Sequence, residues 1–389
     1  MGTRLRPFTL TNPKPLYPIA GKPFIEYLVR QIISFGIKEV VILLGYMPEK
    51  IKRYLGNGER YNISIKYVVT DVNYETEYRL SAARDILDDC FLLMYCDNYC
   101  PIDFEKLKSD FVTNNALIQI TAYANKDGYT KNNIYVDDAG RMTVYDKKRI
   151  VDGLNAVDIG YALLDKNTLD YIDKKNNNFE AIVYPQLVEQ DKAFATVTEH
   201  RYYSIGSTER IELTEKFFSA KKVVFIDRDG TLNIKPPKAC YVETPEEFVW
   251  LKDAKTAVRK LNDAGFSVFL ITNQPGIARG NITVDMLEKI HNKMLADLAE
   301  VGAKIDKIYY CPHGWDEGCD CRKPRPGLLY QAQKEYSLNL RQAYLIGDDD
   351  RDISAGQAAG CKCFMANEQH TLLDIVNTIV RQSSCFNEL

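Results

Sequence analysis

The chain has 389 residues, of which 46% are hydrophobic and 26% charged, a balance typical of globular proteins with enough apolar material for a core. Its 50 Lys and Arg residues nearly cancel its 53 Asp and Glu residues, and the net charge of −3 argues against a nucleic-acid-binding protein. No apolar run approaches the roughly 18 residues of a membrane span, and the polar, basic start is not typical of a signal peptide, so we expect no membrane partner and a cytoplasmic location.

Predicted strands and helices alternate along the chain. Short apolar runs, often β-branched, predict buried strands of parallel sheets at 40–44, 91–95, 223–226, 268–271 and 343–346. Amphipathic patterns predict helices at 24–35, 209–218, 255–264 and 284–301. This alternation indicates an α/β architecture. The helix 209–218 gives way to a polar Ser-Ala-Lys-Lys stretch just before a new buried strand, so we expect two domains, 1–219 and 220–389.

The N-terminal segment is basic and rich in Gly and Pro. Residues 2–7 read Gly-Thr-Arg-Leu-Arg-Pro, and the segments 13–16 (PKPL) and 21–23 (GKP) follow before the helix 24–35. Basic side chains beside exposed backbone amides suit the binding of a triphosphate. The alternative is a basic arm with Pro turns. The candidate nucleotide-binding residues are Gly2, Thr3, Arg4, Lys14 and Lys22.

This segment, and essentially all of residues 1–215, resembles the sugar-1-phosphate nucleotidyltransferases, which join a sugar phosphate to a nucleoside triphosphate and release pyrophosphate. The resemblance implies a Rossmann-like domain of the GT-A type, with a magnesium-binding aspartate at Asp97. The pair Asp146-Lys147 matches a Glu-Lys pair that holds the sugar phosphate, and Asp158, in Asp-Ile-Gly, would lie near the sugar. Lys147 and Asp158 are therefore candidate substrate-binding residues.

Three features depart from the pattern of that family. Members begin with a buried strand and an Ala-Gly-Gly turn before Gly-Thr-Arg, so we expect this domain to be truncated at its start. Bulky residues at 76–80 (TEYRL) replace glycines that usually admit the base, and Ser204 stands where a second metal-binding aspartate is expected. Losing a carboxylate from a two-metal site should weaken cation binding. The domain is then either a divergent transferase read from a late start, or a degenerate scaffold or regulator.

A pair of carboxylates follows the predicted strand 223–226. Asp227 and Asp229, in Asp-Arg-Asp-Gly-Thr, stand where open α/β sheets place their sites. One carboxylate of such a pair can attack phosphorus to form an acyl-phosphate, while the other protonates the leaving oxygen and then deprotonates the hydrolytic water. Taken alone, Asp-x-Asp-Gly is also a common fragment of turns and calcium loops.

Three later segments add groups that suit phosphate and metal. Thr272 and Asn273 offer hydroxyl and amide donors just past an apolar strand. Arg322 and Lys323 supply cations for phosphate oxygens and for the charge of the transition state. Residues 348–352 (DDDRD) place carboxylates at the end of another strand, which suits Mg²⁺.

The order Asp-x-Asp, Thr, Lys and acidic cluster is that of the haloacid dehalogenase (HAD) superfamily, which the second domain resembles from end to end. The resemblance implies a HAD-like Rossmannoid fold and a magnesium-dependent phosphatase that works through a phospho-aspartate. Asp227 would be the nucleophile and Asp229 the general acid and base. Thr272 and Lys323 would bind phosphate, and Asp348 would ligate Mg²⁺ beside Asp227 and the Asp229 carbonyl.

Three of the ten cysteines cluster with one of the four histidines. Cys311, His313, Cys319 and Cys321 offer enough ligands for a closed tetrahedral Zn²⁺ site. Its role would be structural, since it would pin a loop that leads into Arg322. The alternative is four unconnected residues in a reduced protein. Ten cysteines in a long, acid-rich chain favour a reducing compartment over a disulfide scaffold.

The segments 227–231, 241–251 (YVETPEEFVWL) and 272–280 (TNQPGIARG), with the zinc loop, resemble the D-glycero-D-manno-heptose-1,7-bisphosphate 7-phosphatase family. A related family, the histidinol-phosphate phosphatases, shares the zinc loop. By this resemblance Arg279 is a candidate substrate contact, as are Asn273 and Arg322. Members commonly have Gly-Asp-Lys where this chain has Gly-Asp-Asp at 347–349. The lost positive charge could alter substrate preference or magnesium affinity.

Together the two resemblances predict a bifunctional enzyme. The second domain would remove the 7-phosphate from a heptose 1,7-bisphosphate, and the first would join the resulting heptose 1-phosphate to GTP or ATP. One alternative is a phosphatase for histidinol phosphate or another small phosphate ester, with an inactive first domain. Another is a first domain that senses a nucleotide sugar. The nucleotide, the sugar anomer and the oligomeric state stay open.

Overall fold

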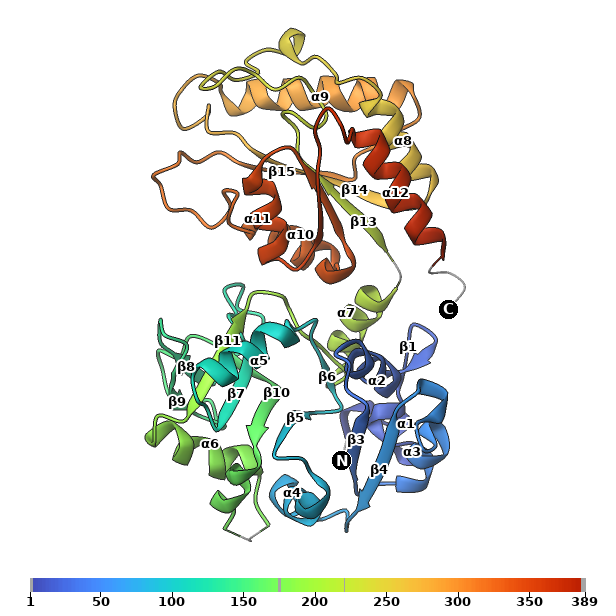
Figure 1. The fold of residues 1–389 in the computed structure, drawn as a ribbon, viewed down its shortest axis with the longest axis vertical. Coiled ribbons are helices and arrows are strands. Elements are labelled where there is room, and N and C mark those ends of the chain that lie inside the picture. The colour runs from blue at the N-terminus through green and yellow to red at the C-terminus, as the bar shows by residue number, and fades with distance from the viewer. Residues whose placement is uncertain (1–2, 174–175, 220, 386–389) are drawn as a thin grey trace. The chain divides into compact units, whose positions relative to one another are not determined.

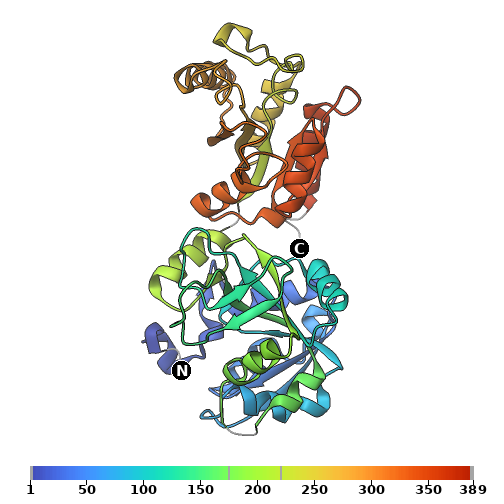
Figure 2. The same cartoon turned by 90° about the vertical axis from the view of Figure 1, so that its left-hand side faces the viewer.

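The computed structural model describes residues 3–173, 176–219 and 221–385, and the chain divides into two compact units, Met1–Ser219 and Ala220–Leu389 (Figures 1 and 2). Both units combine helices with sheets, which confirms the predicted α/β architecture. The nucleotide-binding candidate Gly2 lies outside the described residues. Across the described ranges, no helix has the length and apolar character needed to cross a membrane.

A four-stranded mixed sheet, ordered β11–β7–β10–β5, forms the centre of the first unit, and four two-stranded sheets accompany it in the described part: β1–β2, β3–β4, β6–β12 and β8–β9. The strands are β1 (Pro18–Ile19), β2 (Lys22–Pro23), β3 (Glu39–Leu44), β4 (Ser64–Val69), β5 (Cys90–Met94), β6 (Asn98–Tyr99), β7 (Ile118–Tyr123), β8 (Ile134–Val136), β9 (Met142–Tyr145), β10 (Val157–Asp165), β11 (Ala193–Thr198) and β12 (Tyr203–Ser204). The helices are α1 (Phe8–Thr11), α2 (Phe24–Ser34), α3 (Pro48–Leu55), α4 (Thr76–Ala83), α5 (Phe104–Thr113), α6 (Phe179–Glu189) and α7 (Thr208–Phe218).

The middle of this sheet is covered on both faces. All six residues of β7 are buried, and β7 pairs in parallel with β11 and antiparallel with β10. Helix α6 packs on one face through Phe179, Val183 and Leu187, which recur at the spacing of one helix face. Helix α5 packs on the other face through Phe104 and Leu107. Successive apolar side chains of β7 and β10 thus point to opposite faces of the sheet and belong to two separate hydrophobic cores.

Strands form at 40–44 and 91–95, but the prediction that both are buried and parallel is only partly confirmed. They correspond to β3, which pairs in parallel with β4, and to β5, which pairs antiparallel with β10. Within the described residues each strand has one unpaired edge, and Leu44 is the only buried residue of the two. Two-sided burial is wrong here because an apolar run shows what a strand can bury and does not show whether neighbours cover it.

A five-stranded parallel sheet, ordered β15–β14–β13–β16–β17, organises the second unit. The strands are β13 (Lys222–Ile226), β14 (Phe266–Asn273), β15 (Lys307–Cys311), β16 (Tyr344–Gly347) and β17 (Lys362–Met365). The helices are α8 (Ala254–Asp263), α9 (Val284–Glu300), α10 (Gly327–Tyr336), α11 (Asp350–Ala358) and α12 (Leu372–Cys385). The three strands predicted for this domain are confirmed as β13, β14 and β16.

Helices cover both faces of this sheet, which explains why its strands read as continuous apolar runs. Helices α8, α9 and α12 pack on one face, and α10 and α11 pack on the other. Buried residues along α8, such as Ala254, Val258 and Leu261, lie on a single helix face. The strand order reverses between β13 and β16, and open α/β sheets bind ligands at the carboxyl ends of strands at such a point.

Candidate functional sites

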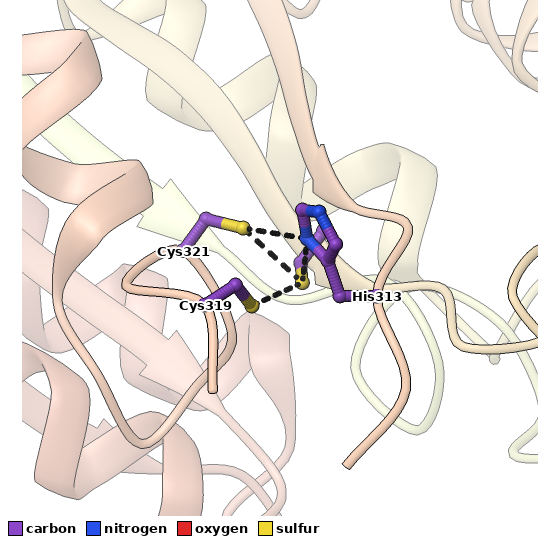
Figure 3. Close-up of side chains that lie close together, drawn as sticks. His313, Cys319 and Cys321 are labelled. Atoms are coloured by element: carbon purple, nitrogen blue, oxygen red, sulfur yellow. Dashed lines mark hydrogen bonds between the residues drawn. The ribbon is translucent and has the colours of Figure 1, made fainter. Parts of the chain in front are cut away.

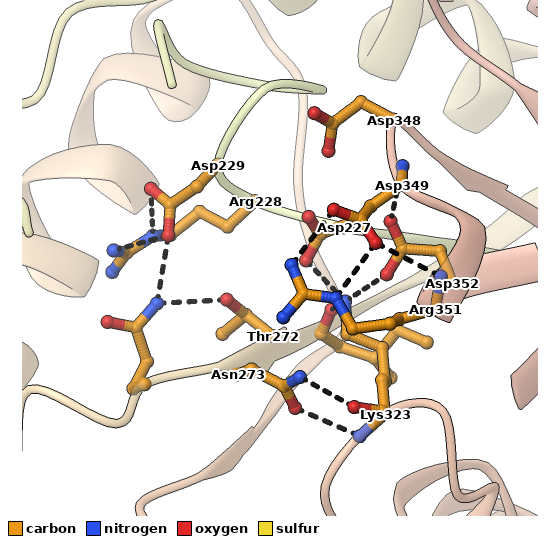
Figure 4. A network of polar contacts seen from close by, with 12 residues as sticks. Asp227, Arg228, Asp229, Thr272, Asn273, Lys323, Asp348, Asp349, Arg351 and Asp352 are labelled. Carbon is orange, nitrogen blue, oxygen red and sulfur yellow. Dashed lines mark hydrogen bonds and ion pairs between the residues drawn. The ribbon is translucent and has the colours of Figure 1, made fainter. Parts of the chain in front are cut away.

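Predicted residues from four segments come together at the carboxyl edge of the five-stranded sheet (Figure 4). Asp227 directly follows β13, and Asp348 directly follows β16. Thr272 and Asn273 are the last residues of β14, because that strand continues beyond its predicted end. Lys323 comes from the loop between β15 and α10. The strand order therefore assembles side chains that are more than a hundred positions apart in the sequence.

Lys323 bridges two buried carboxylates. Its Nζ lies 2.5 Å from Asp227 Oδ1 and 2.6 Å from Asp352 Oδ1, and it donates to the Ile271 carbonyl at 3.0 Å. Burial raises the pKa of Asp227 to about 7, although the Lys323 charge acts in the opposite direction. Burial disfavours the charged form of Lys323, but the two carboxylates outweigh it and raise the Lys323 pKa. The ammonium group is thus kept charged at the centre of the site.

Asp227, Asp348 and Asp352 form an acidic cluster whose ligand oxygens lie within 4.8 Å of one another. Oδ1 of Asp348 is buried without a hydrogen-bond partner, and burial raises the Asp348 pKa. Mg²⁺ prefers carboxylate oxygens, so this donor set, with one oxygen left unsatisfied, fits a magnesium ion. Gly230, at φ +95°, makes the arrangement possible, because a Cβ there would overlap the Asp348 carboxylate.

Asp352, the last residue of the predicted acidic run 348–352, belongs to this cluster, although only Asp348 of that run is predicted as a magnesium ligand. It lies in the first turn of α11 and is 2% exposed. Its carboxylate accepts the backbone N–H of the helix N-cap, Asp349, at 3.1 Å, which completes a capping box. The signal that could have found it is the spacing Asp348–Asp352, which places both carboxylates at the start of one helix, four residues apart.

The Asp229 carboxylate is turned away from the acidic cluster (Figure 4). Arg228 donates to it through Nε (3.1 Å) and Nη2 (2.9 Å), and Asn233 and Gln274 each donate at 3.0 Å. Burial alone would raise the Asp229 pKa, but these donors, with Arg228 the strongest, lower it. Arg228 is fully buried, and its Nη1 lies 3.4 Å from His291 Nε2. In this conformation Asp229 is therefore ionised.

The two candidates on β14 support other groups of the site. The side-chain amide of Asn273 and the backbone of Lys323 exchange two hydrogen bonds, at 3.0 and 3.1 Å. The Thr272 hydroxyl is buried and accepts from Gln274 Nε2 at 2.9 Å. Asn273 thus fixes the loop that carries Lys323, and Gln274 links Thr272 to Asp229.

The candidate substrate residues Arg279 and Arg322 donate hydrogen bonds to different parts of the second unit. Arg322 Nη1 donates to the His313 carbonyl at 3.2 Å, which ties it to the cysteine-rich loop. Arg279 is exposed and donates through Nη1 to the Tyr241 hydroxyl. Both segments quoted for the phosphatase resemblance, 241–251 and 272–280, therefore meet through the pair Arg279–Tyr241.

The four predicted zinc ligands come together where β15 ends: Cys311 is the last residue of that strand, and the other three lie in the loop before α10. Figure 3 shows His313, Cys319 and Cys321 close to one another. Cys311 Sγ lies 3.6 Å from both Cys319 Sγ and His313 Nδ1. Cys321 Sγ lies 3.3 Å from Cys311 Sγ and 3.2 Å from His313 Nδ1. A tetrahedral zinc site with Zn–S bonds of about 2.3 Å has ligand-to-ligand edges of about 3.5–3.8 Å. All three thiols are free, so the donor set and its spacing fit zinc.

A second polar cluster lies in the first unit. Asp97, three residues after β5, pairs with Lys14 at 2.7 Å between Oδ2 and Nζ. Lys147, just after β9, pairs with the buried carboxylate of Glu180 on α6. Burial lowers the Lys147 pKa, and the charges of Asp158 and Asp97 act in the opposite direction. The predicted residues Asp97, Lys14, Lys147 and Asp158 are thus linked by an ion pair and by their charges. Glu180 escapes sequence analysis because only the tertiary fold brings α6 beside β9.

The other features singled out in this unit occupy separate places. Among the nucleotide-binding candidates whose side chains are described, Lys14 alone pairs with Asp97, while the charge of Lys22 acts on Glu26. Ser204 pairs with Asn98 across β6–β12, next to Asp97 in the chain. The residues 76–80 form the first turns of α4, where Arg79 lies against Gly45 at the end of β3.

Two family models match the chain. The nucleotidyl transferase model matches residues 1–209, and the HAD-hydrolase-like model matches residues 320–372. The chain is 40% identical over 141 residues to the D-glycero-beta-D-manno-heptose-1,7-bisphosphate 7-phosphatase of Pseudomonas putida, a match covering 36% of this chain and 79% of that protein. It is 34% identical over 173 residues to the D-glycero-alpha-D-manno-heptose-1,7-bisphosphate 7-phosphatase of Photorhabdus laumondii, covering 42% and 93%.

Solved structures are also similar to parts of the chain. The D,D-heptose 1,7-bisphosphate phosphatase from B. bronchiseptica, complexed with magnesium and phosphate, matches with 32% identity and a TM-score of 0.40, over 41% of this chain and 99% of that one. HddC from Yersinia pseudotuberculosis, complexed with GMP-PN, matches with 18% identity and a TM-score of 0.46, over 54% of this chain and 91% of that one.

Proposed function

We propose that this chain carries out two consecutive steps of heptose activation. Its first unit belongs to the nucleotidyl transferase family. Its second unit belongs to the heptose-1,7-bisphosphate 7-phosphatase family of HAD-like hydrolases. The second unit hydrolyses the 7-phosphate of a heptose 1,7-bisphosphate. The first unit joins the resulting heptose 1-phosphate to a nucleoside triphosphate. The observation that carries the proposal is the 40% identity to a 7-phosphatase across 79% of that protein's length, in a chain that also carries the transferase unit.

Asp227 is the nucleophile of the phosphatase. Its carboxylate oxygen attacks the phosphorus of the 7-phosphate, and the bond between phosphorus and the sugar oxygen breaks. Asp229 gives the leaving oxygen a proton, then takes one from the water that cleaves the acyl-phosphate, which releases phosphate and restores Asp227. Asp229 is ionised while it accepts from Arg228 and Gln274, so it must first leave these donors and take up a proton from solvent before it can contact and protonate the leaving oxygen.

The charged groups around Asp227 bind the phosphate. Lys323 contributes an ammonium group already poised at the nucleophile, and Thr272 contributes a hydroxyl on the neighbouring strand. Asp227, Asp348 and Asp352 would hold Mg²⁺. When bound, magnesium would neutralise phosphate and nucleophile and keep them aligned for in-line attack. The carboxylates of the cluster would then be relieved of the repulsion that accompanies their burial.

The cysteine-rich loop would be a structural zinc site. Its four ligands leave no position for water, the pattern of closed structural sites. Arg322 connects this loop to the catalytic segment, since it donates to the His313 carbonyl and directly precedes Lys323. A zinc ion held by Cys311, His313, Cys319 and Cys321 would therefore fix the approach of Lys323 to Asp227.

In the first unit, Asp97 would bind the cation that accompanies a triphosphate, and Lys147 would hold the sugar phosphate. The heptose phosphate oxygen attacks the α-phosphorus of GTP or ATP, and pyrophosphate leaves. Lys147 suits this role because the charges of Asp158 and Asp97 act on it and favour its ammonium form, against the burial that lowers its pKa. The ion pair of Lys14 with Asp97 supports this proposal, because a cationic side chain beside the metal-binding aspartate suits the oxygens of a triphosphate.

A two-stage assay of the full chain tests the proposal. Heptose 1,7-bisphosphate with Mg²⁺ is expected to release phosphate, and later addition of GTP or ATP is expected to release pyrophosphate. Phosphate without pyrophosphate would reduce the proposal to the phosphatase and favour a first unit that only senses nucleotide sugars. Faster hydrolysis of histidinol phosphate than of heptose bisphosphate would overturn the proposed substrate.

Restoring a carboxylate at Ser204 is expected to strengthen the transferase. Ser204→Asp places an acid beside the chain segment of Asp97, where the family has its second metal ligand. An added carboxylate near a bound cation is worth about tenfold or more in binding. We expect the Mg²⁺ concentration for half-maximal pyrophosphate release to fall by about that factor.

Ser207→Asp is the matched control for this variant. Ser207 is the N-cap of α7, a position that accepts aspartate, and the change adds the same charge three residues away. It should leave the Mg²⁺ dependence unchanged. An equal response of both variants would attribute the effect to net charge and argue against a second ligand position at Ser204.

A further inference from the structure

Asp349 stands where related phosphatases commonly have a lysine, and its side chain is bound by residues of its own helix. Its side chain caps α11, and Arg351 donates to its two oxygens through Nε and Nη2, both at 2.8 Å. The opposite charge of Lys235 lies 3.5 Å from Asp349 Oδ2. The negative charge of Asp349 therefore holds two cationic side chains, Arg351 and Lys235, near the acidic cluster.

Lys235 makes its closer contact with Asp348. Its Nζ lies 2.6 Å from Asp348 Oδ2, while Oδ1 of the same carboxylate is buried without a partner. The backbone beside Lys235 is fixed, because the Ile234 N–H donates to the Val249 carbonyl at 2.9 Å. The lysine side chain is 46% exposed and the Asp348 side chain 14%, so Lys235 approaches the carboxylate from the solvent side.

We propose that Lys235 is a positioning residue of the phosphatase site: by holding Asp348 Oδ2, it fixes that carboxylate so that Oδ1 is left for the cation. The proposal rests on the phosphatase function above. Partners that orient a ligating carboxylate tune metal affinity even though they never touch the metal. Asp349 contributes by holding Lys235 from the other side.

Removing Lys235 should change the Mg²⁺ affinity in opposite directions, depending on whether Lys235 positions Asp348 or only neutralises charge. If Lys235 only offset negative charge, its removal would leave a more negative cluster, and Mg²⁺ would bind more tightly. If Lys235 fixes the carboxylate, its removal frees Asp348 to rotate, and Mg²⁺ binds more weakly in spite of the more favourable charge. The direction of the change in the Mg²⁺ dissociation constant thus separates the two roles.

The test is a calorimetric Mg²⁺ titration of the full chain without substrate, in an Asp97→Asn background that removes the carboxylate of the other unit. Lys235→Met is expected to raise the Mg²⁺ Kd about tenfold, and Lys235→Arg, which keeps a donor and a charge, to stay within about threefold of wild type. Lys238→Met, an exposed lysine of the same loop, is the matched control and should not change Kd. A Kd in Lys235→Met that is unchanged or lower overturns the proposal.

Because no sugar phosphate is present, this test is independent of the proposed substrate. A wild-type chain that binds Mg²⁺ but leaves heptose bisphosphate intact would sink the proposed function, while the comparison of Lys235 variants would still decide the positioning role. Asp348→Asn supplies the baseline, since it removes the carboxylate through which Lys235 is argued to act. Any difference between Lys235→Met and wild type that persists in this background counts against the proposal.

Discussion

Phosphate release is expected to fall by about 10⁵-fold when Asp227 is replaced by Asn. The amide has nearly the shape of the carboxylate, but its oxygen does not form the acyl-phosphate, so the reaction loses its covalent route. The substitution also removes one of two negative charges around Lys323, whose Nζ lies 2.5 Å from Asp227 Oδ1. The measurement is the initial rate of phosphate release from heptose 1,7-bisphosphate at saturating Mg²⁺.

Two comparisons separate loss of the nucleophile from loss of the fold. Asp263→Asn, an exposed residue at the end of α8, is the matched control and should keep full activity. Pyrophosphate release from heptose 1-phosphate and a nucleotide should be the same in Asp227→Asn and wild type, since Asp227 belongs to the other unit. Residual phosphatase activity above about one per cent would contradict the assignment of Asp227 as the nucleophile.

Cys321→Ser is expected to empty the proposed zinc site and to destabilise the second unit. Cys321 Sγ lies within 3.3 Å of both Cys311 Sγ and His313 Nδ1, so its loss opens a four-ligand site. Because metal binding contributes directly to folding, we expect the free energy of unfolding to fall by about 4 kcal/mol or more. Phosphatase activity should fall too, because the loop that continues through Arg322 and Lys323 loses its anchor.

Zinc content by elemental analysis and urea unfolding of the second unit measure both effects. Cys240→Ser replaces an exposed thiol of the same unit outside the cluster and should change neither. Stoichiometric zinc retained in Cys321→Ser, or a wild-type chain that carries no zinc after purification without chelators, would contradict the zinc assignment. A chelator should reproduce in the wild type the destabilisation seen in Cys321→Ser.

The second unit could be predicted from the sequence in considerable detail. In a parallel sheet, the carboxyl ends of the strands share one edge, so residues that directly follow apolar runs are expected to meet. Asp227 and Asp348 are of this kind, and the structure brings both to that edge. The four proposed zinc ligands are close in sequence as well, and their clustering needs only one folded loop.

The sequence does not predict the partners of Asp229 or the places of Lys235 and Asp352, because these depend on side-chain direction and on irregular segments. Asp229 is next to Arg228 in the sequence, yet only the structure shows that its carboxylate accepts hydrogen bonds from Arg228 and from Gln274, which directly follows β14. Lys235 lies in an irregular segment, where no periodicity indicates which way a side chain points. Asp352 is placed by the first turn of a helix whose start could not be located to within a residue.

The first unit is the harder case because its site depends on contacts between distant segments. Lys147 was predicted from a two-residue resemblance, whereas its partner Glu180 comes from a helix more than thirty residues later. The apolar runs correctly predict the strands β3 and β5, but the prediction that both are buried is wrong, because burial is decided by the neighbouring chain.

The unpaired edges of β3 and β5 also bear on how molecules of this protein behave toward one another. Such an edge presents free backbone N–H and C=O groups, and natural proteins usually protect it with charges or Pro. Strand β5 contains neither, and β3 carries a single charge, Glu39, at its start. Within the part of the chain that the structure describes, edge-to-edge pairing between molecules is therefore expected to begin at these strands as concentration rises.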